Sequence, residues 1–300
     1  MLAIEINGLE KSFRGLYAVN ELCMHVPVGS IYGFIGENGS GKSTTEKLIC
    51  GHLVPDCGEI KLFGRSGNDA GVRARVGALI ENAGCFPGSS VYANLMMQAL
   101  NLGIKNRDAE IRRVLKTVRM EDSAKLKFKA CSLGMKQRIG IAMALLGDPK
   151  LLILDEPING LDTDGMRIMR EILTDITRSY GCTVLISSHI LGELEKIATH
   201  YGIIRQGKMI RELSAEEMDS RSRSFVSVGT RDVVGAEAAL GKLFPDVRRE
   251  DGRLHVYDAD DSEAIASYLY KNGHIVNEIK KHKIGLEEYY VELMSKKERA

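Results

Sequence analysis

The sequence has almost no net charge, no tryptophan and no long hydrophobic run. Its 300 residues include 41 lysines and arginines against 40 aspartates and glutamates, which leaves a formal net charge of +1. Proteins that bind nucleic acid usually carry a strong basic excess, so this balance argues against a nucleic-acid partner. No window approaches 18 uncharged apolar residues. The sequence therefore predicts no membrane-spanning helix, and any role at a membrane must come through a partner.

Paired cysteines and a secretion signal are also missing. The six cysteines include no C-x-x-C pair, which argues against a zinc site and favours reduced thiols in a cytosolic chain. Residues 1–5 already carry a charge and lack the apolar run of a signal peptide. The remaining composition, 44% apolar and 27% charged, is typical of a globular protein with one large domain or two unequal ones.

One glycine-rich stretch fits the phosphate-loop pattern G-x-x-x-x-G-K-[ST]. It consists of Gly36, Glu37, Asn38, Gly39, Ser40, Gly41, Lys42, Ser43 and Thr44. Glycines let successive backbone N–H groups turn toward an anion. Lys42 adds a positive charge for the β- and γ-phosphates of a nucleotide, and the Ser43 hydroxyl is placed to ligate Mg²⁺. A predicted buried strand at 30–35 and a predicted helix at 44–50 flank the loop, so the helix N-terminus points at the anion.

Apolar periodicity predicts helices inserted between the strands of a sheet. The strands expected on either side of the loop are 3–7, 18–19, 22–26, 58–64 and 76–80. Helical spacing recurs in 91–102 and 108–120, so a mostly helical insertion is expected at about 88–147. Phe13 lies on the turn of the first hairpin-like region and is placed to stack on an adenine ring, with Tyr17 as the alternative. An aromatic that only fills a strand edge is the competing interpretation.

Two acids follow a short apolar run later in the chain. Leu151–Leu154 are four consecutive apolar residues, which is typical of a strand buried on both faces of a parallel sheet. Asp155 and Glu156 follow at its carboxyl end, where ligands bind in open α/β sheets. The elements expected next are a helix at 164–180, a strand at 183–187, a helix at 190–199 and strands at 202–205 and 208–211.

The composition changes after residue 213. The stretch 214–224 is polar and is expected to be a linker. The elements expected beyond it are strands at 225–228, 253–257 and 275–280 and helices at 236–244, 262–271 and 286–294. The sequence thus predicts an α/β domain at 1–213, joined by the linker to a small α+β domain at 225–300.

Three further stretches narrow the class of nucleotide-binding protein. They are Cys131-Ser132-Leu133-Gly134-Met135-Lys136-Gln137-Arg138, Asn159-Gly160-Leu161-Asp162 and Ser187-Ser188-His189. In this order and spacing they resemble the signature, the D-loop and the switch histidine of the ABC-transporter ATPase family. The resemblance covers residues 1 to about 213. It implies the P-loop NTPase fold of ABC ATPases, with a parallel core sheet, an N-terminal antiparallel β subdomain and a helical signature subdomain.

The resemblance also implies a role for each matching residue, with ATP and Mg²⁺ as cofactors. Glu156 would polarise the attacking water, His189 would hydrogen-bond the γ-phosphate, and Lys42 would bind the β/γ-phosphates. Mg²⁺ would be held by Ser43, Asp155 and Glu81. In the family, the signature of one subunit closes over the nucleotide of another, so the chain is expected to form a head-to-tail homodimer. The residues expected to act at or beside the second subunit's site are Ser132, Leu133, Gly134, Met135 and, in the D-loop, Asp162.

The chain departs from the usual family pattern at three of these positions. Leu133 and Met135 replace a glycine and a glutamine of the signature, while Ser132 and Gly134 keep the phosphate contact. Glu81 stands where most members carry a glutamine, so it adds charge beside the triphosphate. These departures resemble one branch, the ATPase subunits of bacitracin- and lantibiotic-type export and self-protection systems. The stretch 285–293 resembles the closing helix of drug-exporting members of the same branch.

The branch implies a bacterial cytosolic subunit at the inner face of the membrane, bound there to a separately encoded permease. Residues 81–100 are the expected docking surface, with Phe86 and Tyr92 as anchors, although ordinary core packing accounts for either aromatic equally well. A soluble ABC protein acting on ribosomes or DNA is one alternative, and a non-catalytic regulatory ATP binder is another. The single cassette argues against a translation-type protein, and the interval of only about 90 residues between phosphate loop and signature leaves no room for the long coiled coil of DNA-repair types. The presence of Lys42, the two acids and His189 argues against a non-catalytic binder.

Overall fold

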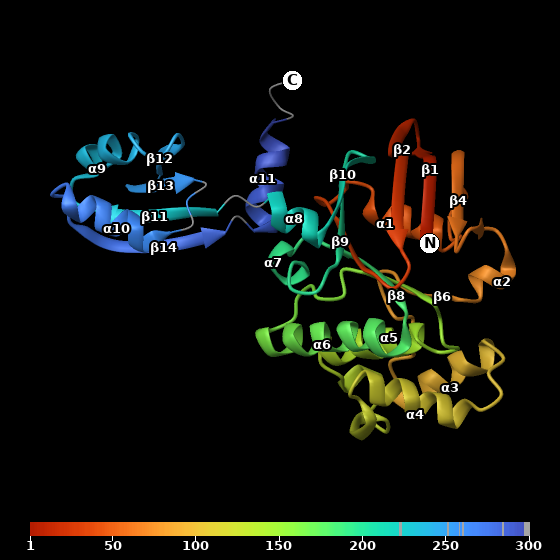
Figure 1. Ribbon diagram of the computed structural model, residues 1–300. Coiled ribbons are helices and arrows are strands. Elements are labelled where there is room, and N and C mark those ends of the chain that lie inside the picture. The colour runs from red at the N-terminus through yellow and green to blue at the C-terminus, as the bar shows by residue number, and fades with distance from the viewer. Residues whose placement is uncertain (222–223, 251, 258, 260, 284, 297–300) are drawn as a thin grey trace. The chain divides into compact units, whose positions relative to one another are not determined.

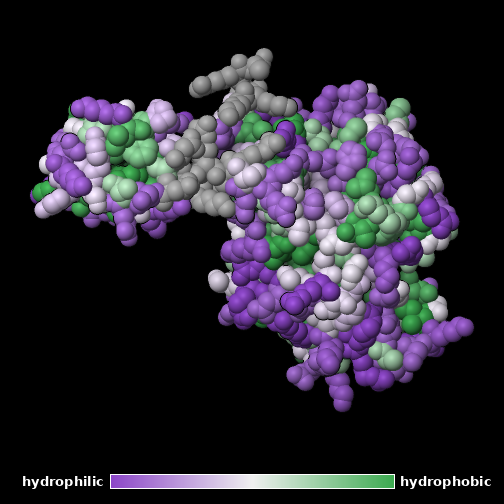
Figure 2. Space-filling model, in the orientation of Figure 1, coloured by the Kyte–Doolittle hydropathy of each residue, from purple (hydrophilic) through white to green (hydrophobic). Residues whose placement is uncertain are grey.

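The computed structural model of the chain describes residues 1–221, 224–250, 252–257, 259, 261–283 and 285–296. It divides into two compact units, Met1–Ala215 and Glu216–Ala300 (Figure 1). Each unit has its own strands, helices and apolar core, as set out below for each in turn. Within the described residues, no helix has both the length and the apolar character needed to cross a bilayer. Figure 2 shows hydrophilic residues over most of the visible surface, with hydrophobic residues in separate patches.

A six-stranded sheet forms the centre of the first unit, in the order β10-β9-β3-β8-β7-β6. Its strands are β3 (Ile31–Ile35), β6 (Val76–Leu79), β7 (Leu151–Asp155), β8 (Thr183–Ser188), β9 (His200–Arg205) and β10 (Lys208–Ser214). All neighbours pair in parallel except β9 and β10, which are antiparallel. Every residue of β3 and β8 is buried, as parallel strands covered on both faces require. The loops after β3, β7 and β8 therefore leave the sheet at the same edge.

A second, antiparallel sheet has the order β2-β1-β4-β5. Its strands are β1 (Leu2–Phe13), β2 (Leu16–Pro27), β4 (Cys57–Leu62) and β5 (Arg65–Ser66), and the short helix α2 (Ala70–Arg73) follows it. Helix α1 (Lys42–Ile49) begins at the end of the phosphate loop. Leu48 and Ile49 of α1 share one buried core with Ile6 and Met24 of this sheet and Ile153 of the central sheet. This shared core fixes α1, and with it the loop, against both sheets.

Helices make up the insertion between β6 and β7. They are α3 (Val91–Asn101), α4 (Arg107–Thr117), the 3₁₀ turns η1 (Glu121–Ser123) and η2 (Phe128–Ala130), and α5 (Leu133–Ala144). Figure 1 shows α3, α4 and α5 on the side of the unit away from β1 and β2. Two serines cap this region, because Ser90 Oγ accepts from the N–H of Ala93 and Ser132 Oγ from that of Met135. Helices α6 (Thr163–Tyr180) and α7 (Leu191–Leu194) flank β8 in the sequence.

The second unit has a four-stranded antiparallel sheet in the order β12-β13-β11-β14. Its elements are α8 (Ala215–Arg221, which begins one residue before the unit boundary), β11 (Ser224–Thr230), α9 (Val233–Leu240), β12 (Val247–Glu250), β13 (Arg253–Tyr257), α10 (Ser262–Lys271), β14 (Val276–Lys283) and α11 (Leu286–Lys296). Val228 and Leu254 pack with Leu240 and Leu269 of the helices into a core of their own. Phe225 precedes the buried Val226 on β11, so its side chain points to the other face of the sheet. There its ring contacts the rings of His255 and Tyr257 on β13 and of His282 on β14.

Several expected elements differ from those observed. The helix expected at 190–199 is only the four-residue α7, because Thr199 already hydrogen-bonds to Ile31 and leads into β9. The expected linker 214–224 contains α8, whose Met218 is buried, while residues 222–223 lie outside the described residues. The strands expected at 18–19 and 22–26 form one continuous strand, β2. Elements β5, α2 and β12 were not expected at all.

Candidate functional site

The phosphate loop has a backbone that only glycine adopts readily at two of its positions. Gly39 and Gly41 have φ angles of 80° and 111°. A Cβ added at Gly41 would lie 2.4 Å from the carbonyl oxygen of Ala18, and one at Gly36 would lie 2.6 Å from that of Ile204. The loop is therefore held in this shape by close neighbours as well as by its own sequence. It lies between β3 and α1, as the sequence predicted.

The phosphate loop holds two buried polar side chains, those of Lys42 and Ser40. The Lys42 side chain is buried, and its Nζ donates to the carbonyl oxygens of Gly36 (2.6 Å) and Glu37 (3.1 Å). Ser40 Oγ is also buried and has no hydrogen-bond partner in the described part of the chain. A buried ammonium group and an unpartnered hydroxyl beside a glycine-rich turn fit an anion such as a nucleotide phosphate.

The acids after β7 meet the residues after β8 at the same edge of the sheet. Asp155 pairs in register with Ser187, and Ser187 Oγ donates to Asp155 Oδ1 at 2.8 Å. Glu156 has a positive φ of 49°, and its N–H donates to Ser187 Oγ at 3.1 Å. Its carboxylate lies 2.8 Å from His189 Nδ1 and 3.9 Å from Lys42 Nζ. Lys42 and His189, which lie far from the two acids in sequence, therefore meet at Glu156, and Ser187 links Glu156 to Asp155.

Glu46 is a further acid of this cluster that the sequence analysis missed. It lies on α1 with a side chain that is 0% exposed, and both carboxyl oxygens lack a well-formed hydrogen bond within the described residues. Burial, and next the charge of Asp155, raise the pKa of Glu46 well above its ordinary value. Its only signal in the sequence is an acid one helical turn after Lys42.

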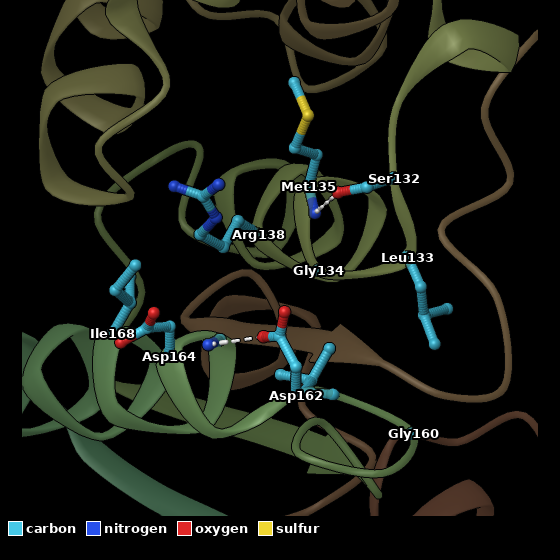
Figure 3. Close-up of a pocket in the computed structure, with 11 residues that line it drawn as sticks. Ser132, Leu133, Gly134, Met135, Arg138, Gly160, Asp162, Asp164 and Ile168 are labelled. Atoms are coloured by element: carbon cyan, nitrogen blue, oxygen red, sulfur yellow. Dashed lines mark hydrogen bonds between the residues drawn. The ribbon is translucent and has the colours of Figure 1, made fainter.

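The signature and the D-loop form a separate cavity of about 410 Å³ (Figure 3). Helices α5 and α6 both begin at this cavity, and the side chain of each N-cap residue accepts a hydrogen bond from a backbone N–H of its helix. Ser132 Oγ accepts from the N–H of Met135, and Asp162 Oδ1 accepts from that of Gly165. Two helix N-termini favour negative charge, so the cavity is a second candidate anion site. None of its lining residues belongs to the phosphate loop of the same chain.

Two of the predicted contacts lie outside these clusters. The Glu81 side chain is 62% exposed, and its Oε1 lies 2.6 Å from Lys47 Nζ, whose hydrogen bond lowers the pKa of Glu81. Phe13 is 46% exposed, with the ammonium of Lys11 5.7 Å from its ring centre, and Tyr17 is also exposed. Stacking of Phe13, or alternatively of Tyr17, on an adenine ring therefore stays a prediction.

Comparisons with known proteins agree with the geometry. The family model for ABC transporters matches residues 19–159. The bacitracin transport ATP-binding protein BcrA of Bacillus licheniformis is 35% identical over 298 residues, which are 97% of each chain. This chain belongs to the ABC transporter family. The lantibiotic transport ATP-binding protein SrtF of Streptococcus pyogenes is 40% identical over 222 residues, 74% of this chain and 95% of that protein.

A solved structure gives the same fold. The cbiO1 subunit from Clostridium perfringens, part of the cbiONQ ABC transporter complex, matches with a TM-score of 0.67, at 24% identity, over 73% of this chain and 91% of that one. The predicted family and the predicted ABC-ATPase fold are therefore confirmed. As a member of this family, the chain is an ATP-binding subunit of a transporter and an ATPase.

Proposed function

We propose that this ABC ATPase powers the export of a peptide antibiotic, or protects a bacterial cell against one. The observation that carries the proposal is the 35% identity to the bacitracin transport protein over 97% of both chains. The lantibiotic transport relative supports the same chemical class of cargo. The cargo itself would pass through a separately encoded integral-membrane permease, so the ATPase would work at the inner face of the cell membrane.

In the proposed mechanism, Glu156 polarises the water that attacks the γ-phosphate. His189 contacts one oxygen of its carboxylate and Lys42 lies near the other, so the group is oriented from two sides beside the phosphate loop. Backbone N–H groups of the loop and the Lys42 ammonium would bind the phosphates once a nucleotide displaces the carbonyl contacts of Lys42. In this mechanism His189 would also donate to the γ-phosphate and respond to its loss.

Mg²⁺ fits the donor set of the same site. The Ser43 hydroxyl and the Asp155 carboxylate are hard oxygen ligands of the kind Mg²⁺ prefers. Mg²⁺ bound with a nucleotide usually keeps several waters and takes one or two carboxylates together with phosphate oxygens, which is the kind of set that Ser43 and Asp155 would complete. Bound Mg²⁺ would supply charge neutralisation at the phosphates. Glu81 stays a predicted additional contact, since in this structure its carboxylate is paired with Lys47.

A second copy of the chain would complete each ATP site. The cavity beside Ser132 and Asp162 fits an anion, yet it is lined by no residue of the phosphate loop. In a head-to-tail homodimer, the α5 N-terminus with Gly134 would face the γ-phosphate held by the other subunit. Leu133 is half exposed at this cavity and would contact the partner directly.

The permease would dock against the helical insertion. A groove of about 340 Å³ is lined by Leu79 at the end of β6, Gln98 of α3, Leu102 at the C-cap of α3, and Met143 of α5. Phe86, 61% exposed in the segment that leads to α3, is available as an anchor. Tyr92 is less suited to this role, because its hydroxyl is engaged by Asp108.

The proposed cargo is tested in the native host. Deleting the gene is expected to lower the minimum inhibitory concentration of bacitracin or of a lantibiotic at least about fourfold, and the wild-type gene but not Glu156→Gln should restore it. A deletion that leaves resistance to both classes unchanged would contradict the cargo. Sedimentation of the tagged chain with ribosomes instead of membranes would favour the soluble alternative.

A further inference from the structure

The turn between β9 and β10 contacts the phosphate loop. Arg205 of β9 pairs with Lys208 of β10, so the turn between them has two residues. They are Gln206 and Gly207, with positive φ angles of 50° and 77°. Gln206 and Lys208 are exposed, whereas Gly207 between them is buried. Because connecting segments usually lie at the surface, the burial of this turn glycine shows that other parts of the chain pack against it.

Both polar groups of the Gly207 backbone form hydrogen bonds outside the hairpin. Its N–H donates to the carbonyl oxygen of Ser40 in the phosphate loop at 2.8 Å, and its carbonyl oxygen accepts from the N–H of Asn20 on β2 at 3.0 Å. A Cβ added at Gly207 would lie 2.9 Å from the carbonyl oxygen of Ala18 and 3.0 Å from the backbone nitrogen of Asn20. Only glycine therefore fits here, between β2 and the phosphate loop, without a shift of the backbone.

The bond to Ser40 sets the direction of the next N–H group in the loop. A trans peptide is planar, and its C=O and N–H point to opposite sides. Because the Ser40 carbonyl is turned outward to Gly207, the N–H of Gly41 is turned the other way. We propose that Gly207 is a positioning residue, which keeps the N–H of Gly41 directed at the bound phosphate and so strengthens ATP binding. The inference rests on the proposed phosphate site and adds to it a residue far along the chain from the loop.

The test compares two hairpin turns of the same kind. The β4–β5 turn has Phe63 and Gly64 at φ angles of 50° and 75°, and a Cβ at Gly64 would meet no atom within 4 Å. Gly207→Ala and Gly64→Ala therefore place the same backbone strain in a turn, but only Gly207→Ala pushes against β2 and away from the phosphate loop.

Gly207→Ala is expected to raise the KM for ATP about tenfold, which corresponds to the loss of about one hydrogen bond. The loop contacts the phosphates in the bound substrate and in the transition state alike, so kcat at saturating ATP should change by less than about twofold. Gly64→Ala should keep the wild-type values of both. Thermal unfolding of each variant shows that it is folded at the assay temperature.

Hydrogen exchange of the wild-type protein tests the same contact without a substitution. The N–H of Gly207 is expected to exchange at least about threefold more slowly with a non-hydrolysable ATP analogue bound, because the phosphate fixes the loop that carries its acceptor. If Gly207→Ala does not fold, this measurement decides alone. A Gly207→Ala protein with the KM of Gly64→Ala, or an exchange rate that the analogue leaves unchanged, would overturn the inference. A folded Lys42→Ala protein with unchanged ATP affinity would instead contradict the phosphate site itself, so the two failures are distinguished.

Discussion

Replacing Glu156 with glutamine is expected to lower the rate of ATP hydrolysis by about 100-fold or more while ATP affinity changes by less than about threefold. The amide keeps the size of the side chain and its contact with His189, but it cannot accept a proton from water. Phosphate release by the purified protein measures the rate, and binding of a fluorescent ATP analogue measures the affinity.

Glu195→Gln is the matched control for this variant. Glu195 is exposed at the end of α7, so its substitution removes the same charge away from the cluster and should leave hydrolysis unchanged. If Glu156→Gln hydrolysed ATP at the wild-type rate, Glu156 would not be the base, and the pairing of its carboxylate with His189 would serve only the structure.

Replacing Lys42 with alanine is expected to weaken ATP binding by about 100-fold, because hydrogen bonds to charged groups contribute about 1.5–3 kcal/mol each. Lys42 now donates to the carbonyls of Gly36 and Glu37, so the variant also loses two contacts that hold the loop. Its thermal unfolding therefore has to be compared with that of the wild type. Titration with the fluorescent analogue measures the affinity.

Lys116→Ala, at an exposed position on α4, controls for the loss of one positive charge and should bind ATP normally. An unchanged ATP affinity in a folded Lys42→Ala protein would show that the loop does not bind the phosphates through this residue.

The parts of the site that could be predicted are those set by local sequence. The loop needs glycine at Gly39 and Gly41 because of its backbone, and that requirement is visible as a pattern. Asp155 and His189 follow short apolar runs, and the carboxyl ends of parallel strands meet at one edge of a sheet. Their convergence near Lys42 therefore followed from the strand assignment alone.

Glu46 could not be predicted in the same way. An acid next to Lys47 on a short helix is most often solvent-exposed, and here its burial depends on how α1 packs against the two sheets. The Lys47–Glu81 pair likewise joins α1 to the segment after β6, which no local pattern relates. Strand β12 was missed because Arg248, Arg249 and Glu250 lack the apolar alternation of a strand.

In the proposed homodimer, the signature of a second copy of the chain closes over each ATP. The most direct measurement is the molar mass of Glu156→Gln in solution with Mg²⁺ and ATP, alone and combined with Gly134→Asp. A Cβ at Gly134 meets only an ordinary contact with Leu161, and an acid in the first turn suits the α5 N-terminus, so the fold should persist. We predict a dimer for Glu156→Gln, and for the double variant a monomer that still binds ATP. A Glu156→Gln protein that stays monomeric with ATP bound, or a double variant that dimerises equally well, would show that the signature of a second copy does not close the ATP site.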